Sequence, residues 1–120
     1  MTDVRTVLVV EDEPLVRLST CEAFTEAGYD VLEAENGEQA VEILTNGSQI
    51  DLVFTDIRLG GVLNGWDVAE EARVAHAGVH VIYASGNPVR PKRNVSGSQY
   101  FQKPYRPQTI VNACRLLASR

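Results

Sequence analysis

Runs of consecutive apolar residues alternate along the chain with segments in which apolar residues recur every three or four positions. The continuous runs predict strands buried on both faces, and the periodic segments predict amphipathic helices. The predicted strands are Thr6–Val10, Tyr29–Ala34, Asp51–Thr55, Val79–Ser85 and Gln99–Gln102. The segment Tyr29–Ala34 is a weaker strand signal in which Asp30 and Glu33 interrupt the apolar residues, so we expect it at an edge of the sheet.

Helices are predicted between these strands from their start and stop signals. The first begins at Pro14 and runs to about Ala27, because Gly28 suits the position after a helix. The others run from a possible cap at Asn36 to Asn46–Gly47, from about Trp66 to His76, and from Pro107 to Ser119. Strands that alternate with helices predict an α/β fold, a doubly wound parallel sheet of five strands with helices on both faces.

The segment 87–98 departs from this alternation. It contains Pro88 and Pro91, several basic residues and no apolar stripe. A proline inside a helix removes a backbone donor and costs ~3 kcal/mol, and no apolar face is present to offset this cost. The sequence therefore predicts a shortened or missing fourth helix.

Composition narrows the class of protein. The chain has 120 residues, of which 44% are hydrophobic, so we expect one domain spanning residues 1–120. The net charge of −5 with no basic stripe argues against direct binding of nucleic acid. No apolar run is long enough to span a membrane, and the amino terminus has no signal-peptide form. The two cysteines, Cys21 and Cys114, lack metal-ligand spacing and are expected in the core of a cytoplasmic protein.

Polar residues whose side chains could take part in chemistry lie at the carboxyl ends of four of the predicted strands. They are Glu11, Asp12, Asp56, Ser85 and Lys103. The carboxyl ends of parallel strands meet at one edge of a sheet, where doubly wound folds bind ligands. Crowded carboxylates repel one another unless a positive group joins them, and an oxygen-only cluster suits Mg²⁺. The hydroxyl and the ammonium suit phosphoryl oxygens, and an aspartate between them can act as a nucleophile.

The segments VLVVEDEP, DLVFTDIRL, NGWDVA, VIYASG and YFQKPY occur in this order, and with them the chain resembles the receiver domain of two-component response regulators. The resemblance covers essentially the whole chain. It implies a flavodoxin-like strand order of 2-1-3-4-5 and a phosphorylatable signalling switch rather than an enzyme. It implies a histidine kinase or a phosphotransfer protein as phosphodonor, and a downstream protein partner or a further relay step. YASG followed by KPY also resembles a subfamily with a Phe-Ala-Thr-Gly-type motif, often single-domain.

The resemblance also assigns roles to residues. It implies that Asp56 is the phosphoacceptor and binds Mg²⁺ together with Asp12 and the backbone carbonyl of Arg58. Glu11 would act on the metal through a water molecule. Ser85 and Lys103 would hold the phosphoryl oxygens.

Other positions match the family's tuning and switching residues. Tyr100 falls on the aromatic switch position, and Ser85 is the partner hydroxyl in place of the commoner threonine. Arg58 and Asn87, each two residues past a site residue, would tune the lifetime of the phosphate. The chain departs from the family pattern at Gly60–Gly61, where the family usually has a proline soon after the phosphoacceptor.

Plainer interpretations apply to some of these residues. Glu13 is expected only to interact favourably with the dipole of the following helix. Trp66 is expected to pack at a helix start, and Tyr100 suits edge packing as well as a switch role.

Two other classes of protein remain possible at this stage. An aspartate-nucleophile phosphatase would usually carry a second aspartate where this chain has Arg58, and would need a cap domain. A flavodoxin-like binding module would need a phosphate-cradling loop after the first strand, where this chain is acidic.

Overall fold

The computed structural model describes residues 4–86 and 93–118, and these residues form one five-stranded sheet in the order β2-β1-β3-β4-β5. The strands are β1 (Thr6–Val10), β2 (Asp30–Ala34), β3 (Leu52–Asp56), β4 (His80–Ser85) and β5 (Gln99–Gln102). All neighbouring strands pair in parallel. The expected order 2-1-3-4-5 and the edge position of β2 are confirmed.

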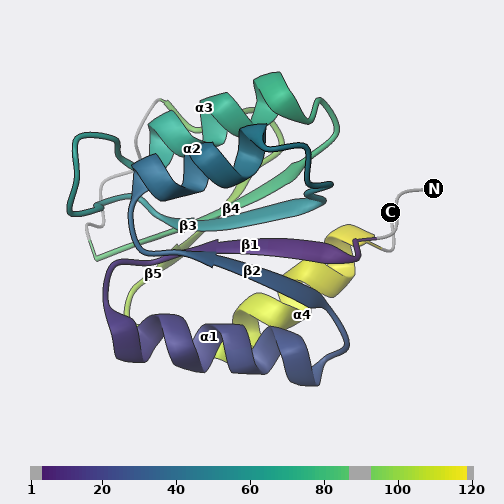
Figure 1. Cartoon of the computed structure of the whole chain (residues 1–120). Helices are drawn as coiled ribbons and strands as arrows, with labels where there is room; N and C mark the ends of the chain where they lie inside the picture. The colour runs from purple at the N-terminus through teal and green to yellow at the C-terminus, as the bar shows by residue number, and fades with distance from the viewer. Residues whose placement is uncertain (1–3, 87–92, 119–120) are drawn as a thin grey trace.

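Within the described residues, four helices cover the sheet: α1 (Pro14–Glu26), α2 (Gly37–Thr45), α3 (Gly65–Ala75) and α4 (Pro107–Ala118). Helices α2 and α3 lie on one face, and α1 and α4 lie on the other (Figure 1). Along β1, Leu8 and Val10 pack under α2 and α3, whereas Val7 and Val9 pack under α1 and α4. Both faces of the central strands are therefore buried, as their continuous apolar runs predict.

Local signals fix where the helices begin and end. The side chain of Asn36 accepts a hydrogen bond from the backbone N–H of Gln39 at the start of α2. Asn64 and Asp67 form a reciprocal capping box at the start of α3. Gly28, directly after the end of α1, has a φ of +99°, a conformation that glycine adopts without steric cost. Caps of this kind satisfy backbone groups that a helix end leaves unpaired.

The connection between β4 and β5 is described from Arg93 onward, and residues 93–98 form turns without a helix. The fourth helix of the described chain, α4, follows β5. The prediction of a shortened or missing fourth helix falls mainly on residues 87–92, which lie outside the described residues, and the structure does not support it.

Contacts with α3 hold the start of the described part of this connection, at Arg93 and Asn94, in place. The guanidinium of Arg93 lies over the ring of Trp66, 5.6 Å from its centroid, and forms ion pairs with Asp67 and Glu70. The indole N–H of Trp66 donates to the side chain of Asn94 at 2.9 Å. The first two turns of α3 thus hold the chain shortly before it enters β5.

Among the described helices, none combines the length and apolar character that crossing a membrane requires. Cys21 and Cys114 are both buried as free thiols, which confirms the prediction that they belong to the core.

Gly65 gives the first testable prediction. A Cβ at this position would lie against the carbonyl oxygen of Asp56 and 2.7 Å from the Cα of Ile57. These are backbone atoms that cannot rotate away, so Gly65→Ala should lower the free energy of unfolding by about 3 kcal/mol, as overpacked sites do. Urea unfolding followed by circular dichroism measures this loss. In the matched control Gly78→Ala the new methyl meets open space, and stability should change by less than about 1 kcal/mol. Equal effects at the two positions would contradict the packing argument.

Candidate functional site

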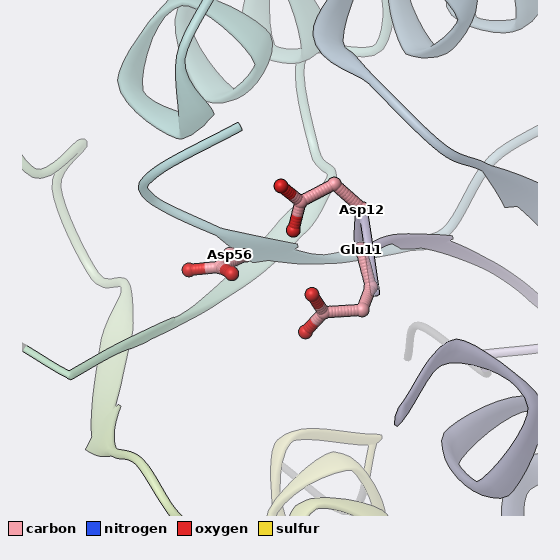
Figure 2. Close-up of side chains that lie close together, drawn as sticks. All are labelled: Glu11, Asp12 and Asp56. Atoms are coloured by element: carbon pink, nitrogen blue, oxygen red, sulfur yellow. The ribbon is translucent and has the colours of Figure 1, made fainter. Parts of the chain in front are cut away.

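Three carboxylates converge at the carboxyl edge of the sheet. Glu11 and Asp12 follow β1, and Asp56 is the last residue of its neighbour β3. One carboxylate oxygen from each residue lies within 4.8 Å of those of the other two, and Figure 2 shows the three side chains directed toward a shared space. Asp12 is exposed, whereas Glu11 and Asp56 are only 1% and 6% exposed. The edge therefore holds a concentrated and partly buried negative charge.

The ammonium of Lys103 joins two of these carboxylates. Its Nζ lies 2.8 Å from Oδ2 of Asp56 and 2.9 Å from Oε1 of Glu11. Lys103 follows β5, and its backbone N–H donates to the carbonyl of Ser85 at the end of β4. The pairing of adjacent parallel strands thus brings Lys103 across to the carboxylates.

Burial and charge perturb the acid–base properties of this cluster. Burial raises the pKa of Glu11 to about 7, against the lowering effect of its hydrogen bond from Lys103. Burial also raises the pKa of Asp56, again against Lys103. Burial alone would lower the pKa of Lys103, but its hydrogen bonds to Asp56 and Glu11 outweigh this and raise it. Lys103 is therefore a permanent cation at neutral pH, and the buried carboxyl groups lack enough positive charge around them.

An open pocket of about 540 Å³ exposes the cluster to solvent. Its lining residues are Asp12, Glu13, Asp56, Arg58, Ser85, Gly86 and Lys103. Asp12, Asp56, Ser85 and Lys103, predicted from their places at the strand ends, thus lie in one concave site. Glu11 is not one of the lining residues, and its side chain is almost completely buried beside Lys103.

The donor set fits a hard divalent cation. The oxygens of Glu11, Asp12 and Asp56 come from carboxylates alone, and Mg²⁺ prefers one or two such ligands and keeps several waters. The raised pKa values of Glu11 and Asp56 indicate that too little positive charge surrounds these carboxylates. A bound cation would supply that charge. The pocket beside the exposed Asp12 is open to solvent, so a bound Mg²⁺ could keep its water ligands there.

The remaining predicted residues take different places. Tyr100 is half-buried on the edge strand β5 and packs against the core under α2 and α3. The side chain of Arg58 is exposed in the loop after β3. Asn87, predicted to tune phosphate lifetime, lies outside the described residues.

Glu13 has more than the role that the sequence predicted for it. It is the N-cap residue of α1 but makes no side-chain cap hydrogen bond. Its carboxylate instead lies 3.5 Å from Nζ of Lys103 and lines the pocket. The run of three acids after β1 was the available signal, because each acid beside a strand end can turn toward the same cation.

Sequence reasoning also missed the hydroxyl pair of Tyr105 and Thr20. Thr20 on α1 donates to the carbonyl of Val16, so its oxygen is left to accept from the hydroxyl of Tyr105 at 2.9 Å. The ring of Tyr105 packs edge-on against Phe54 in the core. This contact holds the chain two residues beyond Lys103 against α1, and the aromatic residue after Lys103–Pro104 was its signal.

A second hollow of about 520 Å³ lies at the opposite ends of the strands. Its polar groups stabilise the fold. The carboxylate of Asp51 accepts the backbone N–H groups of Arg5 and Thr6, and Nε2 of His76 pairs with the carbonyl of Leu44 at 3.0 Å. This hollow lacks the cluster of acids and lysine found at the carboxyl edge.

Comparisons with known proteins agree with this geometry. A family model of the response regulator receiver domain matches residues 7–115. The transcriptional regulatory protein PdtaR of Mycobacterium tuberculosis is 32% identical over 120 residues, which cover 97% of this chain and 58% of that protein. A crystal structure of a response regulator receiver protein from Sinorhizobium medicae superposes with a TM-score of 0.90 at 30% identity, covering 97% of this chain and 95% of that one. The response regulator TrrA of Thermotoga maritima, solved in complex with Mg²⁺ and BeF, gives a TM-score of 0.82 at 29% identity, covering 94% and 98% of the two chains.

The chain belongs to the response regulator receiver domain family. It is a phosphorylation switch of two-component signalling with an acidic Mg²⁺ cluster, a signalling module rather than a true enzyme. This assignment replaces the phosphatase and the flavodoxin-like module that the sequence left open. The chain spans about half the length of these curated relatives: it covers 58% of PdtaR, 48% of ArcA and 52% of AruR.

The raised pKa values give a pH prediction. Between the ordinary value of 4.5 and about 7, the folded state keeps a proton on Glu11 that the unfolded chain has lost. Stability therefore falls as the pH rises through this window, and Asp56 acts in the same direction. Without divalent cations, the free energy of unfolding should fall by about 1–3 kcal/mol between pH 5 and pH 8.

Urea unfolding at a series of pH values checks this decline. Glu11→Gln should flatten it, whereas Glu22→Gln, on the exposed surface of α1, should not. The pKa values of Asp51 and Asp67 are lowered, so these groups make stability depend on pH only below this window. A parent protein whose stability is constant from pH 5 to pH 8 would contradict the argument.

Proposed function

We propose that Asp56 is the residue that accepts the phosphoryl group, with a histidine kinase or a phosphotransfer protein as donor. The observation that carries this proposal is the ion pair of Lys103 with Asp56 inside the acidic pocket. The contact directs one oxygen of Asp56 toward a cation and leaves the carboxylate accessible from the pocket. An accessible carboxylate oxygen beside fixed positive charge is suited to forming an acyl phosphate.

The transfer step follows from the residues around Asp56. A carboxylate oxygen of Asp56 forms the new bond to phosphorus while the bond from phosphorus to the donor imidazole nitrogen breaks, and the imidazole leaves with that electron pair. Lys103 then exchanges its bond to the free carboxylate for one to a phosphoryl oxygen. Ser85 lines the same pocket, and its hydroxyl serves as a further donor to the phosphoryl group.

Asp12, Asp56 and the backbone carbonyl of Arg58 would hold Mg²⁺, with Glu11 acting through a water molecule. The metal would neutralise negative charge on the transferring group. Support comes from the all-carboxylate cluster and from the fold of TrrA, which was solved with Mg²⁺ and BeF.

The long exposed side chain of Arg58 would shield the acyl phosphate by pairing with its oxygens. Asn87 would tune the same hydrolysis.

The output would be a protein contact or onward phosphotransfer. Phosphorylation would bias two conformations of the domain, with Ser85 turning toward the phosphate and Tyr100 responding on the neighbouring strand. Residues Ser85 and Gln102 pair between β4 and β5, so a shift at Ser85 acts on the strand that carries Tyr100.

The motifs YASG and KPY support membership of the Phe-Ala-Thr-Gly-type subfamily, and a single domain over residues 1–120 forms part of this proposal.

Asp56→Asn should abolish phosphorylation while the fold is retained, because the amide is a poor nucleophile of nearly the same size. Incubation with acetyl phosphate or phosphoramidate and Mg²⁺, followed by intact mass spectrometry, measures the adduct. The parent protein should gain one base-labile phosphate, and so should Asp30→Asn, an exposed aspartate on β2. Stoichiometric labelling of Asp56→Asn at another residue would remove Asp56 from the mechanism.

Asp12→Asn should weaken Mg²⁺ binding by about tenfold or more, because one charged ligand is lost. Isothermal titration calorimetry measures the affinity, with Asp30→Asn again as control. Without metal the variant should be at least as stable as the parent, since repulsion within the cluster is reduced. Unchanged Mg²⁺ affinity would exclude Asp12 as a ligand.

A further inference from the structure

The loop between β3 and α3, residues 57–64, borders the site directly. Its first residue, Ile57, donates its backbone N–H to Ala84 on β4 and accepts from the N–H of Gly65. Its last residue, Asn64, caps α3. Both ends are therefore fixed, and the exposed tip at Gly60, Gly61 and Val62 is left to be positioned by other contacts.

The side chain of Glu38 contacts this tip from the first turn of α2. The backbone N–H of Val62 donates to Oε2 of Glu38 at 2.9 Å. Hydrogen bonds from backbone N–H groups, with that of Val62 foremost, lower the pKa of Glu38, so the group is a carboxylate at neutral pH. The residues are 24 positions apart in sequence, so this contact ties two separate elements together.

Two glycines make room for this contact. A Cβ on Gly61 would lie 2.5 Å from Oε1 and 2.9 Å from Oε2 of Glu38, so any side chain at this position would displace the carboxylate. A Cβ on Gly37 would lie 2.7 Å from the Cβ of Leu63. Gly61 does not have the positive φ of Gly28, Gly47 and Gly97, so its backbone conformation does not itself require glycine. The glycine at position 61 is therefore explained by the nearby carboxylate.

The same tip also lies beside the acidic cluster. A Cβ on Gly60 would be 3.7 Å from Oδ2 of Asp12. The tip thus runs between Asp12 in the site and Glu38 on α2. Among the described residues, the acidic cluster comprises Glu11, Asp12 and Asp56, and Glu38 is not part of it.

We propose that Glu38 is a positioning residue for the metal site, which acts by holding the tip at Gly60, Gly61 and Val62 through the N–H of Val62, in the space that Gly61 leaves open. Through this tip it fixes the backbone at Arg58 and the approach to Asp12. The inference rests on the proposed function, in which the carbonyl of Arg58 and the carboxylate of Asp12 are metal ligands. It also explains the departure at Gly60–Gly61, because a residue with a side chain there would exclude Glu38.

A double-mutant cycle tests this inference with the variants Glu38→Ala, Gly61→Ala and their combination. The first readout is hydrogen exchange of the Val62 amide by NMR, without metal, and the second is Mg²⁺ affinity by calorimetry. Each single variant should speed exchange of the Val62 amide by about five- to tenfold and weaken Mg²⁺ binding by several-fold. The double variant should be no worse than Glu38→Ala alone, because the added methyl no longer meets a carboxylate.

Two further variants separate positioning from a general helix effect. Glu38→Asp keeps a negative charge in the first turn of α2 but shortens the side chain, so it should resemble Glu38→Ala if the contact with Val62 matters. If Glu38 only favoured the helix dipole, this variant would behave like the parent, and the inference would be overturned. Glu42→Ala, exposed one turn further along α2, should match the parent in both readouts.

The remaining outcomes are also decisive. Additive effects of Glu38→Ala and Gly61→Ala, or faster Val62 exchange with unchanged Mg²⁺ affinity, would overturn the positioning role. A parent protein that fails to bind Mg²⁺ would overturn the proposed function and this inference together. Normal binding by the parent and by Glu38→Ala would overturn the inference alone.

Discussion

The contact of Lys103 with Glu11 and Asp56 is the interaction on which the rest of the site depends. Three carboxylates at one edge of a sheet repel one another, and two of them are almost completely buried. A buried charge without a partner is expensive, so one ammonium at 2.8 Å and 2.9 Å is what allows both groups to remain there. The same lysine draws the end of β5 toward β1 and β3 across the intervening β4. The same contact therefore both balances the charge of the site and holds the edge strand β5 in place.

Much of this arrangement could be predicted from sequence because parallel strands share a direction. Asp12, Asp56, Ser85 and Lys103 each follow an apolar run, so their meeting at one edge required only the right strand order. The alternation of strands and helices left only a few topologies open, and the resemblance to receiver domains implied the particular order among them. The start of α1 at Pro14 and the Asn36 cap of α2 were predicted correctly because proline acts through its own backbone and asparagine through a backbone N–H three residues on.

The contacts that sequence reasoning missed all join elements distant in the chain. Glu13 looked like a helix-dipole residue, because nothing local shows that its side chain turns toward Lys103. The hydroxyl contact of Thr20 with Tyr105 spans 85 positions and depends on how α1 packs beside the end of β5. Gly61 was recognised as unusual, but the cause, a carboxylate on another helix, appears only once α2 and the loop are placed together. Residues that act through local backbone geometry can be predicted, whereas those that act through packing need the folded chain.

The attachment of the β4–β5 connection to α3 has a practical consequence. Trp66 is the single tryptophan of the chain, and its indole N–H bonds to Asn94 while the guanidinium of Arg93 lies over its ring. Indole emission responds to hydrogen bonding and to nearby cations, so the ultraviolet fluorescence of the unlabelled protein reports on whether these contacts are made. Asn94 lies nine positions after Ser85, in the connection that leads from the site to β5. The chain therefore carries its own optical probe of the β4–β5 connection, in a form that stopped-flow mixing can follow in real time.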